Sequence, residues 1–467
     1  MIKISAKEFA QIVSGEIVAI ADDEVLNQSP VINSKLATAD NFFAAFVGEN
    51  ADGHDYVAEA LSNGAKFALV SKRVSQPSIL VKDVGAALLQ LSKAVRDRLP
   101  NMKVIGITGS QGKTTTKEYL ASILSLVGDT VATKGNFNTD IGLPLTILRA
   151  DEKTQFCILE MGARHAGDID LLTRVSSPNV GVVLVVGSAH LSEFGSVEGI
   201  AKTKGELIRA LPAGATAVLG NQDRFTPKMA DGLDLKRLII GEDVRAGNLE
   251  LPGGYAHFDL VTPTGRVPVS LAQLGEHQVL NALAAATAAF ALGVSNEKIA
   301  DGLTTSDSMS KWRMQVEEVA GITIIHDYYN ANPESMKAAI KSLVVLTQIS
   351  GGASWSILGK MHELGSTESE RHLEVLNYGA EMGVDHFVAV GSDLYAGTNI
   401  DKNQNLKETL AQMSFHYCLD HNAVLQLVSN FSAGDVLLLK ASRSEKFEDL
   451  ADQIKLQLQK RQEEESS

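Results

Sequence analysis

Cysteine is scarce in this 467-residue chain, which contains only Cys157 and Cys418, and long apolar runs are absent. Two cysteines do not provide the disulfide framework of a small secreted protein, and Cys157 lies in an apolar segment where we expect a small core residue. The longest apolar candidate, 180–186, has the length of a buried strand and not the roughly 18 residues of a membrane span. The N-terminus shows no signal-peptide pattern. We therefore expect a cytoplasmic protein without membrane insertion.

Acidic residues outnumber basic residues in this chain. It contains 56 aspartates and glutamates but 42 lysines and arginines, which gives a net charge of −14. Proteins that bind a phosphate backbone usually present a basic surface. The composition therefore argues against nucleic acid as a partner. A diffuse acidic excess otherwise indicates only solubility.

The most informative segment is 105–116, where an apolar strand meets a helix through a glycine turn. Glycines let backbone N–H groups close around phosphate oxygens, Lys113 supplies a charge for the β- and γ-phosphates, and Thr114 can hold Mg²⁺. Apolar residues recur at helical spacing over 119–127, so the positive end of a helix dipole should point at the phosphates. The segment predicts an ATP site whose contact residues are Gly109, Ser110, Gln111, Gly112, Lys113, Thr114 and Thr115. The alternative is a glycine turn that binds nothing.

The loop at 108–116, Thr-Gly-Ser-Gln-Gly-Lys-Thr-Thr-Thr, lacks the first glycine of the common phosphate-loop pattern. In this form it resembles the loop of the Mur ligase family, whose members form amide bonds with ATP in peptidoglycan precursor synthesis. Segments 135–146 and 326–333 resemble the Asn-rich segment and the Tyr-Asn-Ala-Asn-Pro motif of the branch that adds D-alanyl-D-alanine. The resemblance implies a ligase that joins this dipeptide to UDP-N-acetylmuramoyl-tripeptide through an acyl phosphate. It implies small-molecule substrates, ATP and Mg²⁺, and we expect a monomer.

Three regions can be separated by pattern. Residues 1–101 mix short apolar runs with turn signals and end at a plausible linker. Strands alternate with helices over 102–312 and, after a break near 307–310, again over 313–467. The sequence predicts an α/β protein of three domains: an N-terminal α/β substrate domain, a central P-loop-type ATPase with a mainly parallel sheet, and a C-terminal Rossmann-like doubly wound domain.

Polar residues follow two further central strands. Glu160 ends the strand at 156–160, and His190 follows the strand at 180–186. Ligands gather at the carboxyl ends of parallel strands, where Mg²⁺ needs oxygen ligands and can accept an imidazole. Each residue alone would more often be merely solvated or hydrogen-bonded, but their convergence on the phosphate loop favours a metal site. The family resemblance implies the same roles.

Lys204 is expected on the apolar stripe of a helix at 197–211, between Ile200 and Ile208, whereas Lys202 points elsewhere. A lysine that faces the protein must snorkel, lose its charge or find a partner. The resemblance implies that Lys204 is N-carbamylated and becomes a carboxylate-like metal ligand. A snorkelling lysine stays an open alternative. The expected metal ligands are Thr114, Glu160, His190 and Lys204, and the expected catalytic residues are Lys113, Glu160, His190 and Lys204.

A second group of nucleotide contacts is expected further along the chain. His277 and Asn281 share one face of an Ala-rich helix, and an exposed amide can bind an adenine edge. The resemblance implies that Arg313 reaches the nucleotide and that Asp327 meets the ribose, although Gln278 replaces an asparagine usual in the family. A surface salt bridge for Arg313 and a capping role for Asp327 are the alternatives.

The resemblance also implies substrate contacts near the uridine, in the Asn-rich segments and around the incoming dipeptide. These residues are Ser34, Lys35, Asn136, Asn138, Tyr329, Asn330, Asn332, Ser442 and Arg443. The chain departs from the family at several positions, namely Asn33, Lys35, Gln278, Lys360 and Ala441. An inactive nucleotide-sugar-binding relative therefore stays an alternative. Two other rivals are the ligase that adds the third amino acid to UDP-N-acetylmuramoyl-dipeptide and the folylpolyglutamate synthetases, which lack the Tyr-Asn-Ala-Asn-Pro motif.

Overall fold

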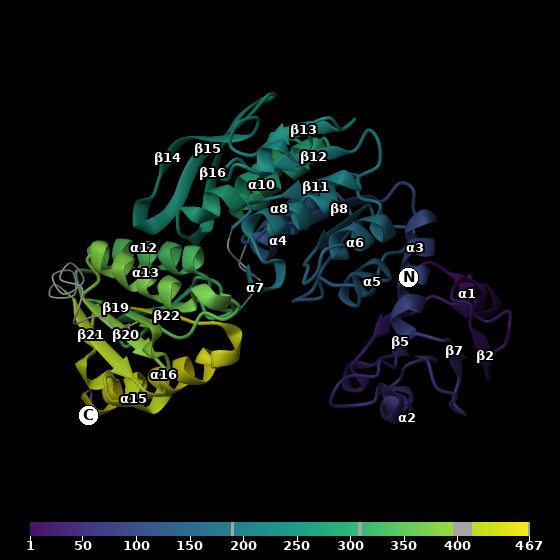
Figure 1. Ribbon diagram of the computed structural model, residues 1–467, viewed down its shortest axis with the longest axis horizontal. Coiled ribbons are helices and arrows are strands. Elements are labelled where there is room, and N and C mark those ends of the chain that lie inside the picture. The colour runs from purple at the N-terminus through teal and green to yellow at the C-terminus, as the bar shows by residue number, and fades with distance from the viewer. Residues whose placement is uncertain (188–190, 307–310, 396–412, 466–467) are drawn as a thin grey trace.

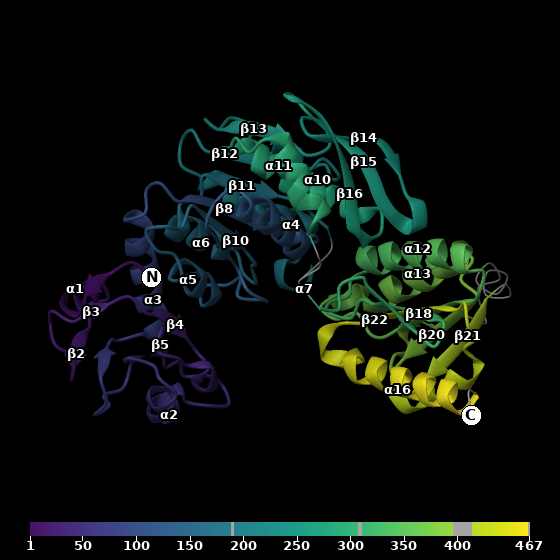
Figure 2. The ribbon, with the colours of Figure 1, turned by 180° about the vertical axis from the view of Figure 1, so that it is seen from behind.

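The computed structural model describes residues 1–187, 191–306, 311–395 and 413–465. The chain forms an arch in which the N-terminal and C-terminal parts lie at opposite ends and the central part joins them (Figures 1 and 2). Each part is built around its own main sheet. The break expected near 307–310 lies outside the described residues, and the domain limits at 102 and 313 stay predictions.

The N-terminal part contains a five-stranded sheet of order β2-β7-β6-β5-β4, parallel except for the β2–β7 pair. Three phenylalanine rings, Phe9, Phe42 and Phe67, pack together in its core. Its elements are β1 (Ile4–Ser5), α1 (Ala6–Ile12), β2 (Glu16–Val18), β3 (Val25–Leu26), β4 (Ser29–Val31), β5 (Asn41–Ala44), α2 (Val57–Ser62), β6 (Ala68–Val70), β7 (Ser78–Leu80) and α3 (Val84–Asp97).

The central part has a six-stranded, wholly parallel sheet of order β13-β12-β11-β8-β10-β9. Its strands are β8 (Lys103–Thr108), β9 (Thr130–Ala132), β10 (Phe156–Glu160), β11 (Val180–Val183), β12 (Thr216–Leu219) and β13 (Lys236–Ile239). Its helices are α4 (Lys113–Ser125), α5 (Gly142–Ile147), α6 (Asp168–Ser176), α7 (Leu191–Phe194), α8 (Val197–Lys204), α9 (Glu206–Arg209), α10 (His277–Ala291) and α11 (Asn296–Thr304). The predicted mainly parallel sheet is confirmed.

Two expected elements are shorter than predicted. The strand expected over 180–186 ends at Val183, because the next backbone turns to the phosphate loop and the carbonyl of Val185 accepts a hydrogen bond from the Ser110 N–H at 2.9 Å. The helix expected over 197–211 is divided into α8 and α9 at Gly205. Glycine is a poor helix former, and periodicity alone does not reveal such a break.

A three-stranded antiparallel sheet was not predicted. It consists of β14 (Arg245–Glu250), β15 (Tyr255–Thr262) and β16 (Gly265–Leu274), with β15 in the middle. Alternate residues of β15 are buried, and two of them, Phe258 and Leu260, join the core formed with the alanines of α10. This alternation is a strand signal that the sequence carries.

The C-terminal part has a six-stranded sheet of order β17-β18-β22-β19-β20-β21, in which only β17 is antiparallel. Hydrophobic cores cover both faces, α12 and α13 on one and α16 on the other, which confirms the doubly wound fold. The elements are β17 (Gln315–Val319), β18 (Ile322–His326), α12 (Pro333–Ser350), β19 (Ser354–Leu358), α13 (Glu368–Glu381), β20 (His386–Val390), β21 (Ser414–Cys418), α15 (His421–Leu425), β22 (Val436–Lys440) and α16 (Phe447–Glu465).

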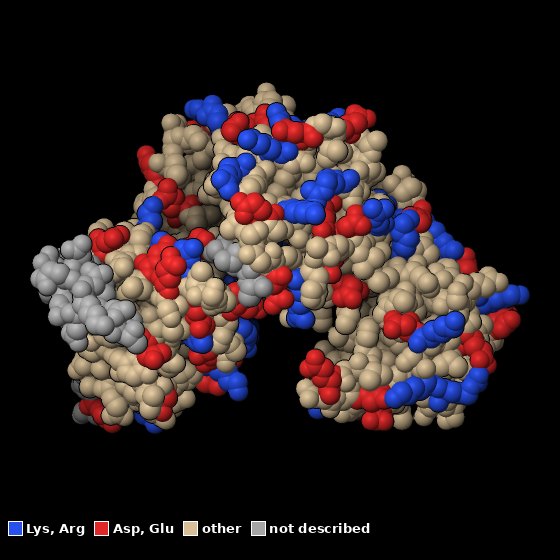
Figure 3. Space-filling model, viewed as in Figure 1, with Lys and Arg blue, Asp and Glu red and all other residues tan. Residues whose placement is uncertain are grey.

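Basic and acidic side chains are interspersed over the face shown in Figure 3, and an open notch separates the two ends of the arch.

Within the described ranges, none of the helices combines the length and the apolar character needed to cross a bilayer.

Arg96 connects the N-terminal part to the central part. Only 7% of this residue is exposed, and its guanidinium donates to the carbonyls of Ser176 at 3.0 Å, Ser177 at 3.3 Å and Leu99 at 2.8 Å. Two of these carbonyls belong to the end of α6, where Ser177 adopts a left-handed conformation. The side chain therefore satisfies backbone groups that a helix end leaves without partners.

We predict that Arg96→Met lowers the free energy of unfolding by roughly 2–3 kcal/mol, because buried carbonyls lose a charged donor. Urea denaturation measures the change. Arg98→Met is the matched control at the end of the same helix, since Arg98 pairs with Glu8 on the surface, where their side chains are 39% and 42% exposed. Loss of such an exposed pair is expected to cost less than about 1 kcal/mol. Equal losses in both variants would contradict the assignment.

Candidate functional site

The phosphate loop follows β8 and leads into α4. Gly112 has a φ of 77°, and a Cβ at this position would lie 2.3 Å from Oδ1 of Asn281. The backbone conformation therefore favours glycine here, and a Cβ would also force the Asn281 amide to shift. The Lys113 ammonium donates to the Gly109 carbonyl at 2.8 Å, and burial lowers its pKa, although Glu160 acts in the opposite direction. An anion in the loop would stabilise the charged form of Lys113.

Glu160 ends β10 beside this loop and is 4% exposed. Its Oε2 accepts a hydrogen bond from the Thr114 hydroxyl at 2.9 Å, and its Oε1 accepts one from the Asn138 amide at 3.0 Å. Both partners are neutral, and the cations that act on this carboxylate are Lys113 and Lys117. No three His, Cys, Asp or Glu side chains gather into a metal site within the described residues. A carboxylate and a hydroxyl beside a phosphate loop fit Mg²⁺, which commonly takes phosphate and water as its other ligands.

Lys204 is buried at the end of α8, as its place on the apolar stripe predicted, whereas Lys202 is exposed. Burial lowers the pKa of Lys204 well below its usual value, and the charge of Lys113 lowers it further. A lowered pKa increases the share of the neutral amine, which is the form that reacts with carbon dioxide. The other proposed metal ligand, His190, lies outside the described residues.

The C-terminal part presents Arg313 and Asp327. The Arg313 guanidinium lies 4.1 Å above the ring of Tyr329, and its Nε is buried without a hydrogen-bond partner within the described structure. Asp327 forms an ion pair with Lys440 at 2.6 Å, and its other oxygen accepts a 3.3 Å hydrogen bond from the Met314 N–H. The capping alternative for Asp327 is wrong, because the side chain of Asn332 caps the nearby helix α12.

His277 and Asn281 lie at the start of α10, facing the phosphate loop. Burial lowers the pKa of His277 to about 4, so its imidazole is neutral at pH 7. The Asn281 amide donates to the side-chain oxygen of Gln278 at 2.9 Å. The residue that replaces the family's usual asparagine therefore contacts the amide that we expect near the adenine.

Apart from Gly109 and Lys204, which are not among its lining residues, these groups surround one cavity of about 320 Å³ between the central and C-terminal sheets. The predicted residues that line it are Ser110, Gln111, Gly112, Lys113, Thr114, Thr115, Asn136, Asn138, Glu160, His277, Asn281, Arg313, Asp327, Tyr329, Asn330 and Asn332. Sequence reasoning missed Gln278, Met314, Ser335, Ala338 and Lys440 as lining residues. Lys440 could have been found, because a charged residue that ends an apolar strand was the signal that identified Glu160.

A smaller pocket of about 170 Å³ brings together Ser442 and Arg443 with Asn330 and Asn332 of the larger cavity. The Arg443 guanidinium lies 4.4 Å above the ring of Trp312 and pairs with Glu448 at 2.5 Å. Glu363 also lines this pocket, which therefore presents a cation and two carboxamides for the carboxylate of a small peptide and a carboxylate for its ammonium. The two pockets share the loop that precedes α12.

Ser34 and Lys35 lie apart from these pockets in the N-terminal part of the arch. Ser34 donates to a Glu59 carboxylate oxygen at 2.6 Å, and the Lys35 side chain is exposed. Within the described residues, none from 1–101 lines the 320 Å³ cavity. A ligand that contacts both places must be long, or the parts must move together.

Two further cavities adjoin His277. One of about 150 Å³ continues from Gly112 along Leu184 and Ile240. The other, of about 570 Å³, lies between the three-stranded sheet and α12 and has mainly apolar walls. The smaller one adjoins the phosphate loop directly, whereas the larger one is lined by none of the loop residues.

Comparison with known proteins identifies relatives over nearly the whole chain. Residues 107–289 match the Mur ligase middle domain, and residues 312–443 match the Mur ligase, glutamate ligase domain. The UDP-N-acetylmuramoyl-tripeptide--D-alanyl-D-alanine ligase of Mycobacterium tuberculosis is 34% identical, covering 95% of this chain and 96% of the relative.

Solved structures agree with this match. MurF from Acinetobacter baumannii superposes with a TM-score of 0.85 at 33% identity, covering 97% of this chain and 99% of that one. MurF from Thermotoga maritima, in complex with ADP, gives a TM-score of 0.76 at 29% identity, covering 93% and 99%. The family expected from the motifs is thus confirmed by sequence and by structure, and the chain belongs to the Mur ligase family.

Proposed function

We propose that this enzyme joins D-alanyl-D-alanine to UDP-N-acetylmuramoyl-tripeptide in peptidoglycan precursor synthesis. It is an ATP-dependent, amide-forming ligase. The observation that carries the assignment is the single cavity in which the phosphate loop and Glu160 of the central part face Arg313 and Asp327 of the C-terminal part. Relatives that share almost the whole chain bear the name of this ligase.

The nucleotide is assigned to the 320 Å³ cavity. The loop N–H groups and Lys113 hold the β- and γ-phosphates, and the buried Nε of Arg313 supplies an unused donor for an anion. Asp327 binds the ribose hydroxyls, while Asn281 and His277 lie beside the adenine. Thr114, Glu160, His190 and carbamylated Lys204 hold Mg²⁺, which, when bound, neutralises charge on the transferred phosphoryl oxygens.

The reaction proceeds in two steps. The terminal carboxylate of the tripeptide attacks the γ-phosphorus of ATP, which gives an acyl phosphate and releases ADP. The amine of D-alanyl-D-alanine then attacks the acyl carbon, and phosphate leaves as the amide bond forms. Both steps need positioning and charge neutralisation more than a protein nucleophile, and Lys113 is placed to supply the charge.

The two substrates are assigned to different parts of the chain. Ser34 and Lys35 bind the uridine end of the nucleotide substrate, and Asn136 and Asn138 guide its peptide toward Glu160. Ser442 and Arg443, together with Tyr329, Asn330 and Asn332, hold the incoming dipeptide by its carboxylate. We further propose that the enzyme acts as a cytoplasmic monomer, without insertion into a membrane and without a nucleic-acid partner.

Lys113→Ala is expected to reduce turnover roughly 10²- to 10³-fold, because a group that stabilises transferred charge is lost. Phosphate release measures turnover, and circular dichroism checks the fold. Lys103→Ala is the matched control, since Lys103 is exposed at the opposite end of the same strand. Turnover of Lys113→Ala close to that of Lys103→Ala would refute the role of the loop.

Lys204→Ala is expected to lose most activity and to regain part of it when short carboxylic acids are added, because they replace the carbamate oxygens. The matched control is Lys202→Ala, which removes an exposed lysine from the same helix and should stay near wild type. Full activity of Lys204→Ala, or no recovery with added acids, would refute the carbamate.

Phosphate release with UDP-N-acetylmuramoyl-tripeptide is expected to depend on D-alanyl-D-alanine, because Ser442 and Arg443 are placed to bind the carboxylate of a dipeptide. Free D-alanine and meso-diaminopimelate should not replace it. The assay compares initial rates with each acceptor. Efficient use of a free diamino acid with the muramoyl dipeptide would instead identify the ligase that adds the third amino acid.

A further inference from the structure

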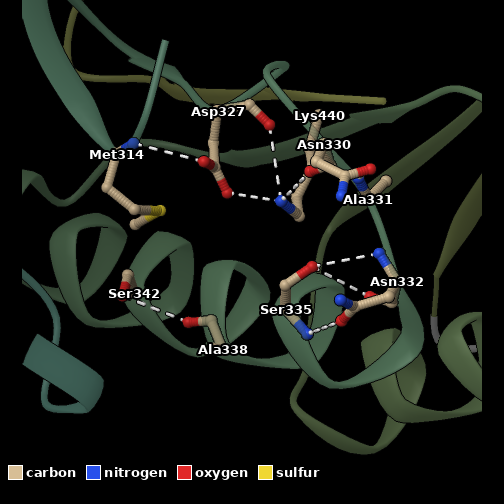
Figure 4. Close-up of polar contacts among 9 residues, drawn as sticks. All are labelled: Met314, Asp327, Asn330, Ala331, Asn332, Ser335, Ala338, Ser342 and Lys440. Atoms are coloured by element: carbon tan, nitrogen blue, oxygen red, sulfur yellow. Dashed lines mark hydrogen bonds and ion pairs between the residues drawn. The ribbon is translucent and has the colours of Figure 1, made fainter. Parts of the chain in front are cut away.

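Lys440 is the most deeply buried charged group that faces the nucleotide cavity without a role in the reaction described above. It ends β22 and is 1% exposed. Its ammonium donates to Oδ2 of Asp327 at 2.6 Å, to the carbonyl of Asn330 at 2.9 Å and, more weakly, to the carbonyl of Asp327 at 3.4 Å. Figure 4 shows the ammonium enclosed by these oxygens. The three ammonium protons thus have three acceptors, all on one loop.

The position of Lys440 follows from the sheet. Strands β18 and β22 are parallel neighbours, with His326 opposite Leu439, so Asp327, the residue after β18, lies beside Lys440, the last residue of β22. The Asp327 N–H also donates to the Leu439 carbonyl at 3.0 Å. The contact is therefore imposed by strand register and not by a flexible side chain that happens to reach a carboxylate.

The loop held by Lys440 forms part of both pockets. Asn330 lines the 320 Å³ nucleotide cavity and also the 170 Å³ pocket that contains Ser442 and Arg443. The strand that carries Lys440 continues directly to Ser442, whose hydroxyl accepts a hydrogen bond from the His362 N–H at 3.0 Å. One buried ammonium therefore connects walls of the two pockets.

The contacts of Asp327 also extend to Arg313 and Met314, at the start of the C-terminal part. Oδ1 of Asp327 accepts from the Met314 N–H, and Arg313, the preceding residue, stacks on Tyr329 of the held loop. In Figure 4 the carboxylate of Asp327 lies between Met314 and Lys440. Both its oxygens are thus engaged, which fixes its orientation toward the cavity.

We propose that Lys440 is a positioning residue that fixes Asp327 and the Asp327–Asn330 loop, so that the nucleotide and the acceptor dipeptide are held in register. The proposal rests on the ligase function stated above. Lys440 touches neither reacting atom. It acts through the carboxylate that meets the ribose and through the backbone that separates the two substrates.

Loss of the ammonium has a specific consequence. The Asp327 side chain is only 13% exposed, so without the ammonium a largely buried carboxylate would lack its cation. The Asn330 carbonyl would lose its donor at the same time. The loop would then turn to find new partners, and both pockets would lose their shape.

The test is the Lys440→Met variant of the full chain. The dissociation constant for ADP, measured by calorimetry, and the KM for D-alanyl-D-alanine, measured by phosphate release, should each rise about tenfold or more, the loss expected when a hydrogen bond to a charged group is removed. Lys455→Met is the matched control, because Lys455 pairs with Glu317 in the same part of the chain, 3.0 Å apart and away from the pockets. It should leave both values within about twofold of wild type.

A double-mutant cycle with Asp327→Asn tests whether Lys440 acts through Asp327. The effects on ADP binding should be less than additive, since either change disrupts the same pair. If Lys440→Met does not fold, Lys440→Gln replaces it in the comparison, because the glutamine amide can still donate two hydrogen bonds. The Lys440→Gln substitution should weaken ADP binding less than tenfold, yet more than Lys455→Met does. Thermal unfolding of each variant shows whether it is folded.

Three outcomes would overturn the proposal: a folded Lys440→Met variant with unchanged ADP affinity, one with an unchanged KM for the dipeptide, or additive effects in the cycle. Failure of the ligase function is a separate result. It would appear in the wild-type enzyme as phosphate release that does not depend on D-alanyl-D-alanine, whereas ADP binding is measured without turnover.

Discussion

The register of the parallel strands is the constraint on which the site depends. Ile107 of β8 lies opposite Glu160 of β10, and Thr108 lies opposite Val183 of β11. The backbone pairing of the strands therefore places the phosphate loop next to the Glu160 carboxylate. A shift of one residue along a strand would turn Glu160 to the other face of the sheet. The second sheet repeats the arrangement with Asp327 and Lys440, so the nucleotide cavity is formed where the carboxyl edges of two sheets face each other.

Charge is distributed unevenly across this cavity. In the central part, burial lowers the pKa of both Lys113 and Lys204, and each is further affected by a neighbouring cation. In the C-terminal part, Asp327 already has its cation in Lys440. In the central part Glu160 acts on Lys113 in the opposite direction, and a polyphosphate would add further negative charge where the loop N–H groups already point. Binding of a nucleotide would therefore favour the charged form of Lys113.

Local sequence predicted the elements best where one periodicity dominates. The strands at 156–160 and 216–219 agree with β10 and β12, because each is an apolar run of strand length between turn signals. Gly205 divides a helix whose apolar stripe is continuous, so the stripe correctly predicted the burial of Lys204 and wrongly predicted one helix. The role of Lys440 depends on a partner 113 residues away, and no local pattern encodes that contact.

The Asn-Ala-Asn-Pro segment illustrates how one motif serves both structure and binding. The side-chain oxygen of Asn330 accepts a hydrogen bond from the Ala331 N–H at 2.9 Å, and that of Asn332 accepts one from the Ser335 N–H and caps α12. Proline at the first position of this helix has no N–H to leave without a partner. Both residues also line the two pockets, where their N–H groups are donors for a ligand. Such donors suit the carboxylate of a peptide, so the same two residues serve both the fold of the loop and the binding of a ligand.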